Sequence, residues 1–181
     1  GKTEAELMAA LEAGVRLFSA ESLRDLTRLS AACQRHGCEV EVLLRVNPEE
    51  APEARLAMSG VESQFGFAEP LLLTAEARSQ VRPPGVSPAG VHVYFGTQVA
   101  GVDALVMNTR RAMQCARRVE EALAFQCRIL NAGGGFPWPY ANDQPPASLD
   151  GLKDMLGQAW QASEFARRGT SLWFESGRRL C

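Results

Sequence analysis

The chain has 181 residues, of which 46% are hydrophobic and 22% are charged, and its formal net charge is -2. This composition is typical of a globular protein, and the slight acidity argues against a non-specific nucleic-acid binder or a protein that binds anionic membranes. No apolar run approaches the roughly 20 residues of a membrane span, and no secretory signal pattern opens the chain. We therefore expect a cytoplasmic protein with a sizeable core.

The cysteines do not follow a metal-ligand pattern. Their number is odd, and no pair of Cys or His residues has the spacing of a zinc site. We expect reduced thiols and no metal. The five are Cys33, Cys38, Cys115, Cys127 and Cys181.

Helices and strands alternate along the first part of the chain. The first helix is indicated by a capping box, in which Thr3 precedes Glu6 and an apolar face. The expected elements are a helix over 3–13, a strand over 15–18, a helix from 23 to 37, a strand over 40–46, and an irregular segment over 49–68.

The same alternation continues to the end of the chain. Pro83, Pro84, Gly85 and Pro88 predict a connector rich in turns. The expected elements are a helix over 69–80, a strand over 91–95, a helix over 102–124, a strand over 126–131, a helix over 148–168, and a strand over 172–174.

Five apolar strands separated by helices predict a parallel sheet covered by helices. A doubly wound sheet and a (β/α)8 barrel both fit this pattern. Five βα units are too few to close an eight-stranded barrel, which typically takes about 250 residues. The chain also begins directly in a helix and stops soon after a strand, so we expect a segment of a longer protein.

Polar residues or glycines follow almost every predicted strand, at the edge where α/β folds bind ligands. An alternative is that they cap the following helices, which is as good an explanation for Ser19, Ser22 and Asn47. Capping does not explain Arg45 or Glu175, because a charge next to an apolar strand needs a partner. The candidates are Ser19, Glu21, Arg45, Asn47, Gly96, Thr97, Gly133, Gly134, Gly135, Glu175 and Arg178.

Three consecutive glycines, Gly133 to Gly135, follow the strand that ends at Asn131. Such a segment is either a flexible turn or a loop whose amides converge on a phosphate. Glu175 and Arg178 lie three residues apart after the last strand, so they could contact two ends of one ligand. The guanidinium would then bind a phosphate beside the glycines.

His92 and Tyr94 alternate along one strand and are expected on the same face. A buried histidine that serves the core is the commoner case, and a ligand contact is the alternative. Tyr94 could stack on a planar ring or pack in the core.

Seven segments in this order resemble the fold-type III pyridoxal-phosphate decarboxylases, which act on ornithine, diaminopimelate, lysine or arginine. The similarity extends over nearly the whole chain. It is carried by Lys2 with Glu6-Leu7, Phe18-Ser19-Ala20-Glu21-Ser22, Leu44-Arg45-Val46-Asn47-Pro48, Ser63-Gln64-Phe65-Gly66-Phe67, residues 90–98 (Gly-Val-His-Val-Tyr-Phe-Gly-Thr-Gln), Gly133-Gly134-Gly135-Phe136-Pro137 and Glu175-Ser176-Gly177-Arg178.

The resemblance implies that residues 1–181 form part of a (β/α)8 barrel that binds pyridoxal 5'-phosphate and an amino-acid substrate. It also implies a following β-domain and a homodimer that shares its active sites. Gly133, Gly134, Gly135 and Arg178 would hold the phosphate. Glu175 would bond to the pyridine nitrogen and keep it protonated, which strengthens the electron sink.

The remaining site residues follow from the same resemblance. Arg45, His92 and Tyr94 would line the cofactor, and Thr97 stands where the family has a serine near the phosphate. Related alanine racemases place an arginine at the pyridine nitrogen, so Glu175 favours decarboxylation over racemisation.

The chain departs from the family pattern at several positions. Tyr94 stands where the family has a histidine stacked on the pyridine ring. Gln64 replaces a lysine, and Ser176 replaces a proline. The lysine that forms the Schiff base would lie before residue 1, and neither Lys2 nor Lys153 takes its place.

We therefore expect a segment of a pyridoxal-phosphate-dependent amino-acid decarboxylase that is inactive by itself. Two alternatives remain open at this point. One is a non-catalytic homologue that serves as a binding or regulatory module, and the other is a racemase of the same fold.

Overall fold

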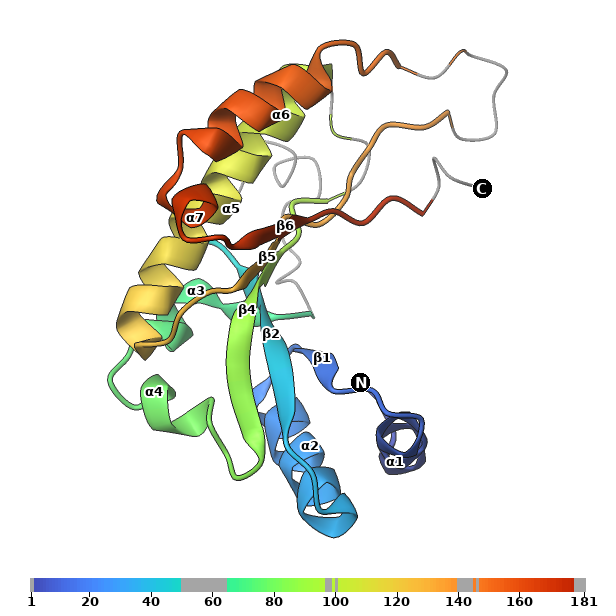
Figure 1. The fold of residues 1–181 in the computed structure, drawn as a ribbon, viewed down its shortest axis with the longest axis vertical. Coiled ribbons are helices and arrows are strands. Elements are labelled where there is room, and N and C mark those ends of the chain that lie inside the picture. The colour runs from blue at the N-terminus through green and yellow to red at the C-terminus, as the bar shows by residue number, and fades with distance from the viewer. Residues whose placement is uncertain are drawn as a thin grey trace.

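The computed structural model describes residues 2–49, 65–96, 99, 101–139, 145 and 147–177. Its centre is a parallel sheet with the strand order β1-β2-β4-β5-β6, and the short β3 pairs with β2 (Figure 1). The parallel sheet expected from the sequence is confirmed. The strands are β1 (Leu17–Ala20), β2 (Val40–Asn47), β3 (Phe67–Ala68), β4 (Val86–Val93), β5 (Ile129–Asn131) and β6 (Ser171–Trp173).

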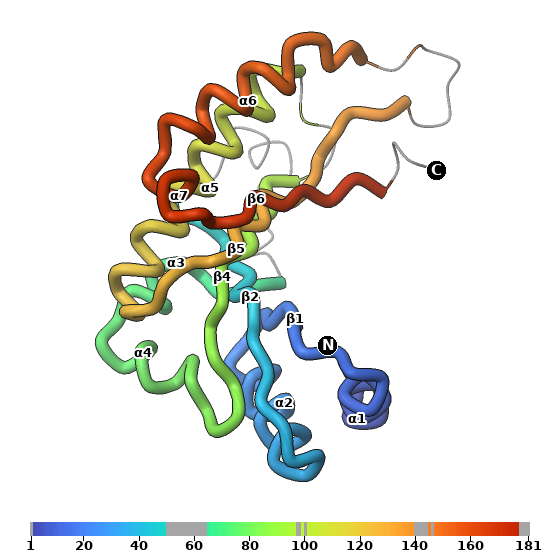
Figure 2. Tube along the Cα trace, viewed as in Figure 1, coloured from blue at the N-terminus to red at the C-terminus, as the bar shows by residue number. Residues whose placement is uncertain are grey.

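Helices alternate with the strands along the chain, as its path in Figure 2 shows. They pack against one face of the sheet. β1 and β6 are the two ends of the sheet in the described part of the chain, so the strands form an open arc of a barrel. The helices are α1 (Glu4–Glu12), α2 (Leu23–His36), α3 (Glu69–Leu72), α4 (Ala77–Gln80), α5 (Gly101–Leu123), α6 (Leu152–Gln161) and α7 (Glu164–Arg167).

The start of the chain folds as its sequence predicts. Thr3 caps α1, and Glu6 completes the capping box by accepting hydrogen bonds from Thr3. Ser22 caps α2 by accepting a hydrogen bond from the Asp25 amide, at 3.1 Å. Gly37 then ends α2 in the left-handed conformation that glycine adopts without strain.

Two helices that the sequence predicts as continuous are each interrupted in the structure. The helix expected over 69–80 is two short helices, because Leu73 ends α3 and the Thr74 hydroxyl accepts a hydrogen bond from the Ala77 amide. The helix expected over 148–168 begins only at Leu152. It breaks where the Ser163 hydroxyl accepts a hydrogen bond from the Ala166 amide and so starts α7.

Strand boundaries also differ from the predicted ranges. β4 begins at Val86 instead of residue 91, although it contains Pro88. Pro88 has no amide N–H, but at this level β4 pairs only with β2, since pairing with β5 starts at Gly90. β4 also ends at Val93, so Tyr94 follows the strand instead of lying within it. The other shifts are small: β1 starts at residue 17, β5 at 129 and β6 at 171, while β3 lies in the segment predicted to be irregular.

The two faces of the sheet have different partners. Val42, Leu44, Val91 and Leu130 are fully buried and belong to the core beneath the helices. Strand residues alternate between faces, so their neighbours form the opposite, inner face. There β4 and β5 approach so closely that a Cβ at Gly90 would overlap the Ile129 carbonyl oxygen. The inner face therefore requires glycine at this position.

An ion pair between a buried carboxylate and a partly exposed arginine joins α3 to α5. The Glu69 side chain is almost fully buried, and its oxygens accept hydrogen bonds from Arg118 at 2.6 and 3.1 Å and from the Glu49 amide at 3.0 Å. Burial alone would raise the pKa of Glu69, but Arg118 and the Glu49 amide outweigh it and hold this pKa below its ordinary value of 4.5.

We expect Arg118→Ala to lower the free energy of unfolding by about 2–4 kcal/mol at neutral pH, because it leaves a buried carboxylate without its cation. A group with a depressed pKa stabilises the fold above its ordinary pKa and loses this effect on acidification. The deficit of the variant should therefore shrink as the pH falls below 4.5. Urea unfolding across that range measures it. A deficit that does not depend on pH would mean that the Arg118 side chain stabilises the fold through packing.

The cysteines are free thiols in the described residues, which include all but Cys181. Burial raises the pKa of Cys33 to about 11 and that of Cys127 to about 12, so both stay protonated. Among the described residues, no group of three His, Cys, Asp or Glu side chains could hold a metal ion. No described helix is both long enough and apolar enough to cross a membrane.

Candidate functional site

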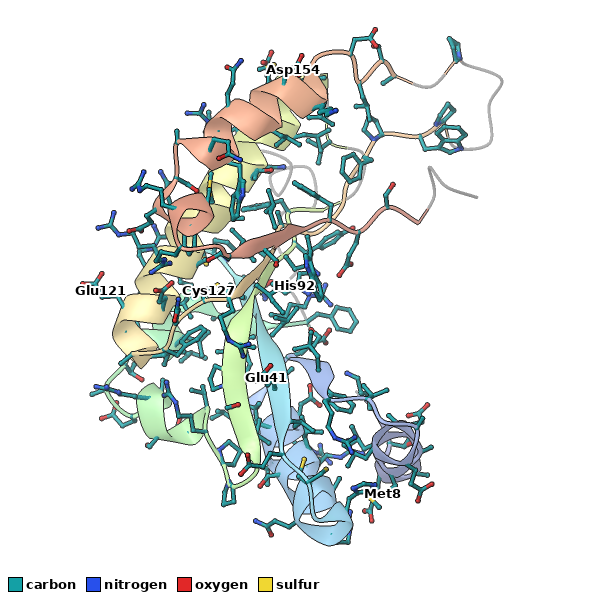
Figure 3. All side chains as sticks on the ribbon, viewed as in Figure 1. Met8, Glu41, His92, Glu121, Cys127 and Asp154 are labelled. Atoms are coloured by element: carbon teal, nitrogen blue, oxygen red, sulfur yellow. The ribbon has the colours of Figure 1, made fainter. Side chains whose placement is uncertain are left out.

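One row of polar side chains crosses the inner face of the sheet where the strands end. Parallel pairing places Arg45 beside His92 and His92 beside Asn131. Glu21 directly follows β1 and so continues the row on one side. Figure 3 shows His92 at this end of the sheet, whereas Glu121 and Asp154 project from the helices. The fold thus gathers residues that lie far apart in the sequence along a single line.

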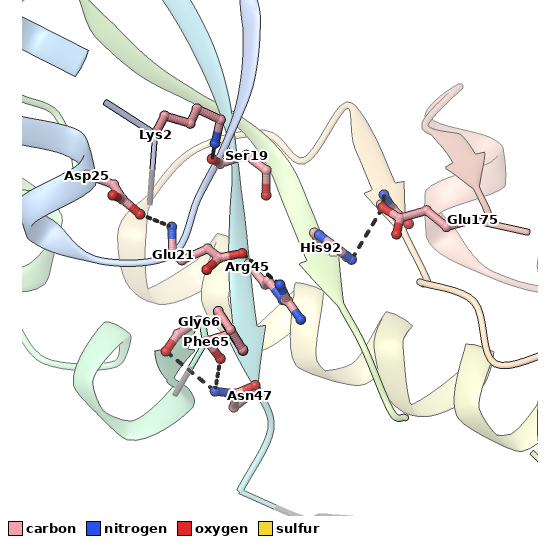
Figure 4. Close-up of polar contacts among 11 residues, drawn as sticks. Lys2, Ser19, Glu21, Asp25, Arg45, Asn47, Phe65, Gly66, His92 and Glu175 are labelled. Carbon is pink, nitrogen blue, oxygen red and sulfur yellow. Dashed lines mark hydrogen bonds and ion pairs between the residues drawn. The ribbon is translucent and has the colours of Figure 1, made fainter. Parts of the chain in front are cut away.

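The charge of Arg45 is neutralised within this row. Its Nη1 donates a hydrogen bond to Glu21 Oε1 at 2.6 Å (Figure 4). Its guanidinium also lies 5.5 Å from the ring centre of Phe65 and 5.6 Å from that of Tyr94. Both distances are typical of cation–π contacts. Arg45 Nε is buried without an acceptor among the described residues. The strand-end charge that the sequence leaves unexplained therefore has a carboxylate partner and still presents a free N–H.

The glycine triplet is a tightly packed bend. A Cβ at Gly133 would lie 2.7 Å from the Val93 carbonyl oxygen, and one at Gly135 would lie 2.7 Å from that of Gly96. A Cβ at Gly134 would overlap the Glu175 carbonyl oxygen. Gly133 and Gly135 also have positive φ angles, of 70° and 92°. Side chains are thus excluded because neighbouring backbone lies against the bend.

Two amides of this bend have no acceptor among the described residues. The Gly133 amide donates to Asn131 Oδ1 at 2.9 Å, but no atom of the described chain accepts from the amides of Gly134 and Gly135. Successive free amides in a turn form a site for an anion. Of the two alternatives that the sequence leaves open, a packed bend with free amides fits the phosphate loop better than the flexible turn.

Glu175 lies beside the glycine bend and is bonded to it. Its backbone amide donates to the Gly133 carbonyl at 2.9 Å, and its Oε1 accepts a hydrogen bond from Asn131 Nδ2 at 2.8 Å. The side chain is 57% exposed, so it can meet a ligand at this edge. Parallel pairing of β5 with β6 brings the two segments together.

His92 lies in the middle of the row, close to Glu175. Its Nε2 lies 3.6 Å from Glu175 Oε1, too far for a hydrogen bond, and has no other partner among the described residues. Burial lowers the pKa of His92 below its ordinary value of 6.5. The charge of Glu175 opposes this shift and that of Arg45 adds to it. The imidazole is therefore neutral at pH 7.

We expect the ring resonances of His92 to titrate below pH 6.5 in an NMR pH series. Since the unfolded chain binds this proton more readily than the fold, His92 should also make the protein less stable as the pH falls below 6.5. His92→Gln should reduce that pH dependence in urea unfolding. The other histidine of the chain is His36, a half-buried residue at the end of α2. His36→Gln identifies its NMR signal and is the matched control for His92→Gln. A His92 titration above 6.5 would contradict the neutral imidazole.

Several predicted site residues cannot be placed beside this row. Thr97 and Arg178 lie outside the described residues, so the expected approach of Arg178 to the glycines is untested. Gln64, which departs from the family pattern, also lies outside them. Conversely, Asn131 was not predicted as a site residue. The sequence does indicate one of its contacts, because an asparagine two residues before a glycine is typical of a turn in which the side chain accepts a hydrogen bond from the backbone.

Comparison with known proteins assigns the family. Residues 1–181 match the family described as "Pyridoxal-dependent decarboxylase, pyridoxal binding domain". The chain belongs to this decarboxylase family. The resemblance found in the sequence is thereby confirmed.

Two curated relatives of the chain have different substrates in their names. The chain is 27% identical to L-glutamyl-[BtrI acyl-carrier protein] decarboxylase of Niallia circulans over 183 residues. It is 28% identical to diaminopimelate decarboxylase of Archaeoglobus fulgidus over 181 residues. Each alignment covers 99% of this chain and 42% of the relative, so the chain spans less than half the length of these proteins.

Solved structures of the family share the fold. Diaminopimelate decarboxylase of M. jannaschii, in complex with L-lysine, superposes with a TM-score of 0.80 at 23% identity, covering 99% of this chain and 42% of that one. Lysine decarboxylase of Selenomonas ruminantium gives a TM-score of 0.72, also at 23% identity, over 100% of this chain and 44% of that one. At this identity the comparison establishes the fold alone, and it confirms the partial barrel.

The site residues fit the cofactor that names this decarboxylase family. Pyridoxal phosphate is a rigid planar ring with an anionic phosphate at one side and a basic nitrogen in the ring. The bend offers free amides to an anion, and Glu175 offers a carboxylate to a protonated nitrogen. Lys2 donates to the carbonyl of Ser19 in β1, at the opposite end of the strand order from β6 and the Glu175 that follows it, and Lys153 lies in α6. Neither lysine adjoins the bend.

Proposed function

We propose that this chain forms the pyridoxal-phosphate site of an amino-acid decarboxylase that is active as a longer protein. One observation carries the proposal: the glycine bend and Glu175 lie at the same strand edge and are joined by hydrogen bonds. A site for one rigid ligand needs its two contact points at a fixed separation. The family assignment supports the same reaction class.

The predicted site residues have defined tasks in this proposal. The amides of Gly134 and Gly135 bind the phosphate, and Arg178 and Thr97 add donors to it. Tyr94 packs on the ring of the ligand, while Arg45 lines the site from the neighbouring strand. Bound pyridoxal phosphate supplies an electron sink for the electrons released at Cα when the substrate carboxylate leaves as CO2.

Glu175 decides the reaction type in this proposal. Its carboxylate accepts a hydrogen bond from the ring nitrogen and holds the proton there, which makes the sink stronger. An arginine at this place, as in the racemase alternative, would leave the nitrogen without a proton. The carboxylate therefore favours decarboxylation. We further propose that the lysine for the Schiff base comes from protein outside this chain, and that the whole enzyme is a homodimer.

Arg178→Ala tests the phosphate site in the full-length protein. A guanidinium that bonds to phosphate contributes about 1.5–3 kcal/mol, so affinity for pyridoxal phosphate should fall by roughly 10- to 100-fold. Titration followed by cofactor absorbance measures this. Arg167→Ala is the matched control, because Arg167 is exposed in α7 and bonds to the Ala162 carbonyl. Equal affinities of the two variants would place the phosphate elsewhere.

A further inference from the structure

Asn131 connects the two parts of the proposed site with one side chain. Its Oδ1 accepts from the Gly133 amide at 2.9 Å, and its Nδ2 donates to Glu175 Oε1 at 2.8 Å. Both polar atoms are engaged, and the residue is buried at the end of β5. The amide is thus fixed in one orientation, with its acceptor toward the bend and its donor toward the carboxylate.

The backbone alone does not fix the Glu175 carboxylate. The bond from the Glu175 amide to the Gly133 carbonyl, at 2.9 Å, holds the main chain of the two segments together. Beyond the backbone, the side chain is more than half exposed and has several rotatable bonds. His92 Nε2 is 3.6 Å away and does not bond to it. In the described part of the chain, Asn131 is therefore the hydrogen-bond donor that selects one rotamer of Glu175.

We propose that Asn131 is a positioning residue that sets the separation between the Glu175 carboxylate and the glycine bend. This proposal rests on the proposed function, because the separation matters for a rigid ligand that contacts both. Asn131 itself does not touch the ligand. It acts through Glu175 on the ring nitrogen, and through Gly133 on the shape of the bend that binds the phosphate.

Two substitutions separate these two effects. Asn131→Ser keeps a side-chain oxygen that can accept from the amide two residues ahead, but it removes the Nδ2 group that donates to Glu175 and leaves a shorter side chain. Asn131→Leu removes both hydrogen bonds at similar volume. Asn108→Asp, at a half-buried position in α5, is a control for the stability of the preparation.

The experiment measures the affinity of the full-length protein for pyridoxal phosphate and for its 1-deaza analogue, in which carbon replaces the ring nitrogen. We expect Asn131→Ser to weaken binding of pyridoxal phosphate by about tenfold, the equivalent of one hydrogen bond, and to leave the analogue unchanged. Asn131→Leu should weaken both ligands. If Asn131→Ser weakens both equally, or neither, Asn131 does not act through Glu175 and the proposal fails.

A second measurement needs no ligand and keeps the two proposals distinguishable. The Glu175 carboxylate raises the pKa of His92, so the His92 ring reports where that carboxylate lies. If Asn131→Ser frees Glu175 to turn into solvent, the pKa of His92 should fall further. An unchanged or higher pKa overturns the positioning role. A wild-type protein that does not bind pyridoxal phosphate, but in which the His92 pKa falls on this substitution, overturns the proposed function alone.

Discussion

Glu175→Gln in the full-length protein should lower kcat for decarboxylation by roughly 10²- to 10³-fold, the size of effect seen when one electrostatic contact to the reacting system is removed. Glutamine has the same length and can still accept a hydrogen bond from Asn131 Nδ2, which lies 2.8 Å from Glu175 Oε1. The geometry of the site should therefore persist. What is lost is the negative charge that holds a proton on the ring nitrogen. Release of CO2 and cofactor affinity, measured on the same preparation, separate catalysis from binding.

A matched substitution checks that the loss is local. Glu164→Gln removes a carboxylate from α7, where Glu164 pairs with Arg117 at 3.5 Å on an exposed surface. This variant should keep the wild-type rate, since exposed ion pairs contribute little. In Glu175→Gln, but not in Glu164→Gln, the pKa of His92 should also fall, because the neighbouring negative charge is gone. A wild-type rate in Glu175→Gln would mean that this carboxylate does not meet the ring nitrogen.

Local signals in the sequence predicted the fold well where one segment determines its own structure. The capping box of Thr3 and Glu6 sets the start of α1 without help from other elements. Apolar strands separated by helices likewise predicted the parallel sheet. The breaks at Leu73 and Ala162 were missed because apolar spacing continues across them. Pro88 indicated a turn, and only the pairing pattern shows why a strand tolerates it there.

The site was predictable in its residue types but not in its contacts. Glu175 and the glycines were identified because each follows a strand, and all such ends meet at one edge of a parallel sheet. The partners of Arg45 depend on long-range pairing, which places Glu21 at the end of the neighbouring β1 and Phe65 in the segment that leads into β3. For Asn131 the sequence indicates only the local bond to the Gly133 amide, because the link to the segment after β6 depends on the pairing of β5 with β6. Its second bond, to Glu175, spans 44 residues of sequence.

The second large effect concerns the middle glycine of the bend. We expect Gly134→Ala to lower affinity for pyridoxal phosphate by more than about tenfold and the free energy of unfolding by about 1–3 kcal/mol, as overpacking does. The new Cβ would overlap the Glu175 carbonyl oxygen, so the bend and the segment after β6 must separate. That separation moves the free amides and the carboxylate apart. Thermal unfolding and cofactor titration measure the two effects independently.

Gly134 is the informative position because its backbone conformation is open to alanine. Gly133 and Gly135 have positive φ angles, so alanine there would add backbone strain to any steric effect. Gly157→Ala in α6 is the control: a Cβ there has open space, and alanine favours a helix by about 0.5–1 kcal/mol. It should leave affinity unchanged and stability equal or higher. If Gly134→Ala binds pyridoxal phosphate as the wild type does, the separation of bend and carboxylate does not control binding, and the rigid-ligand argument is wrong.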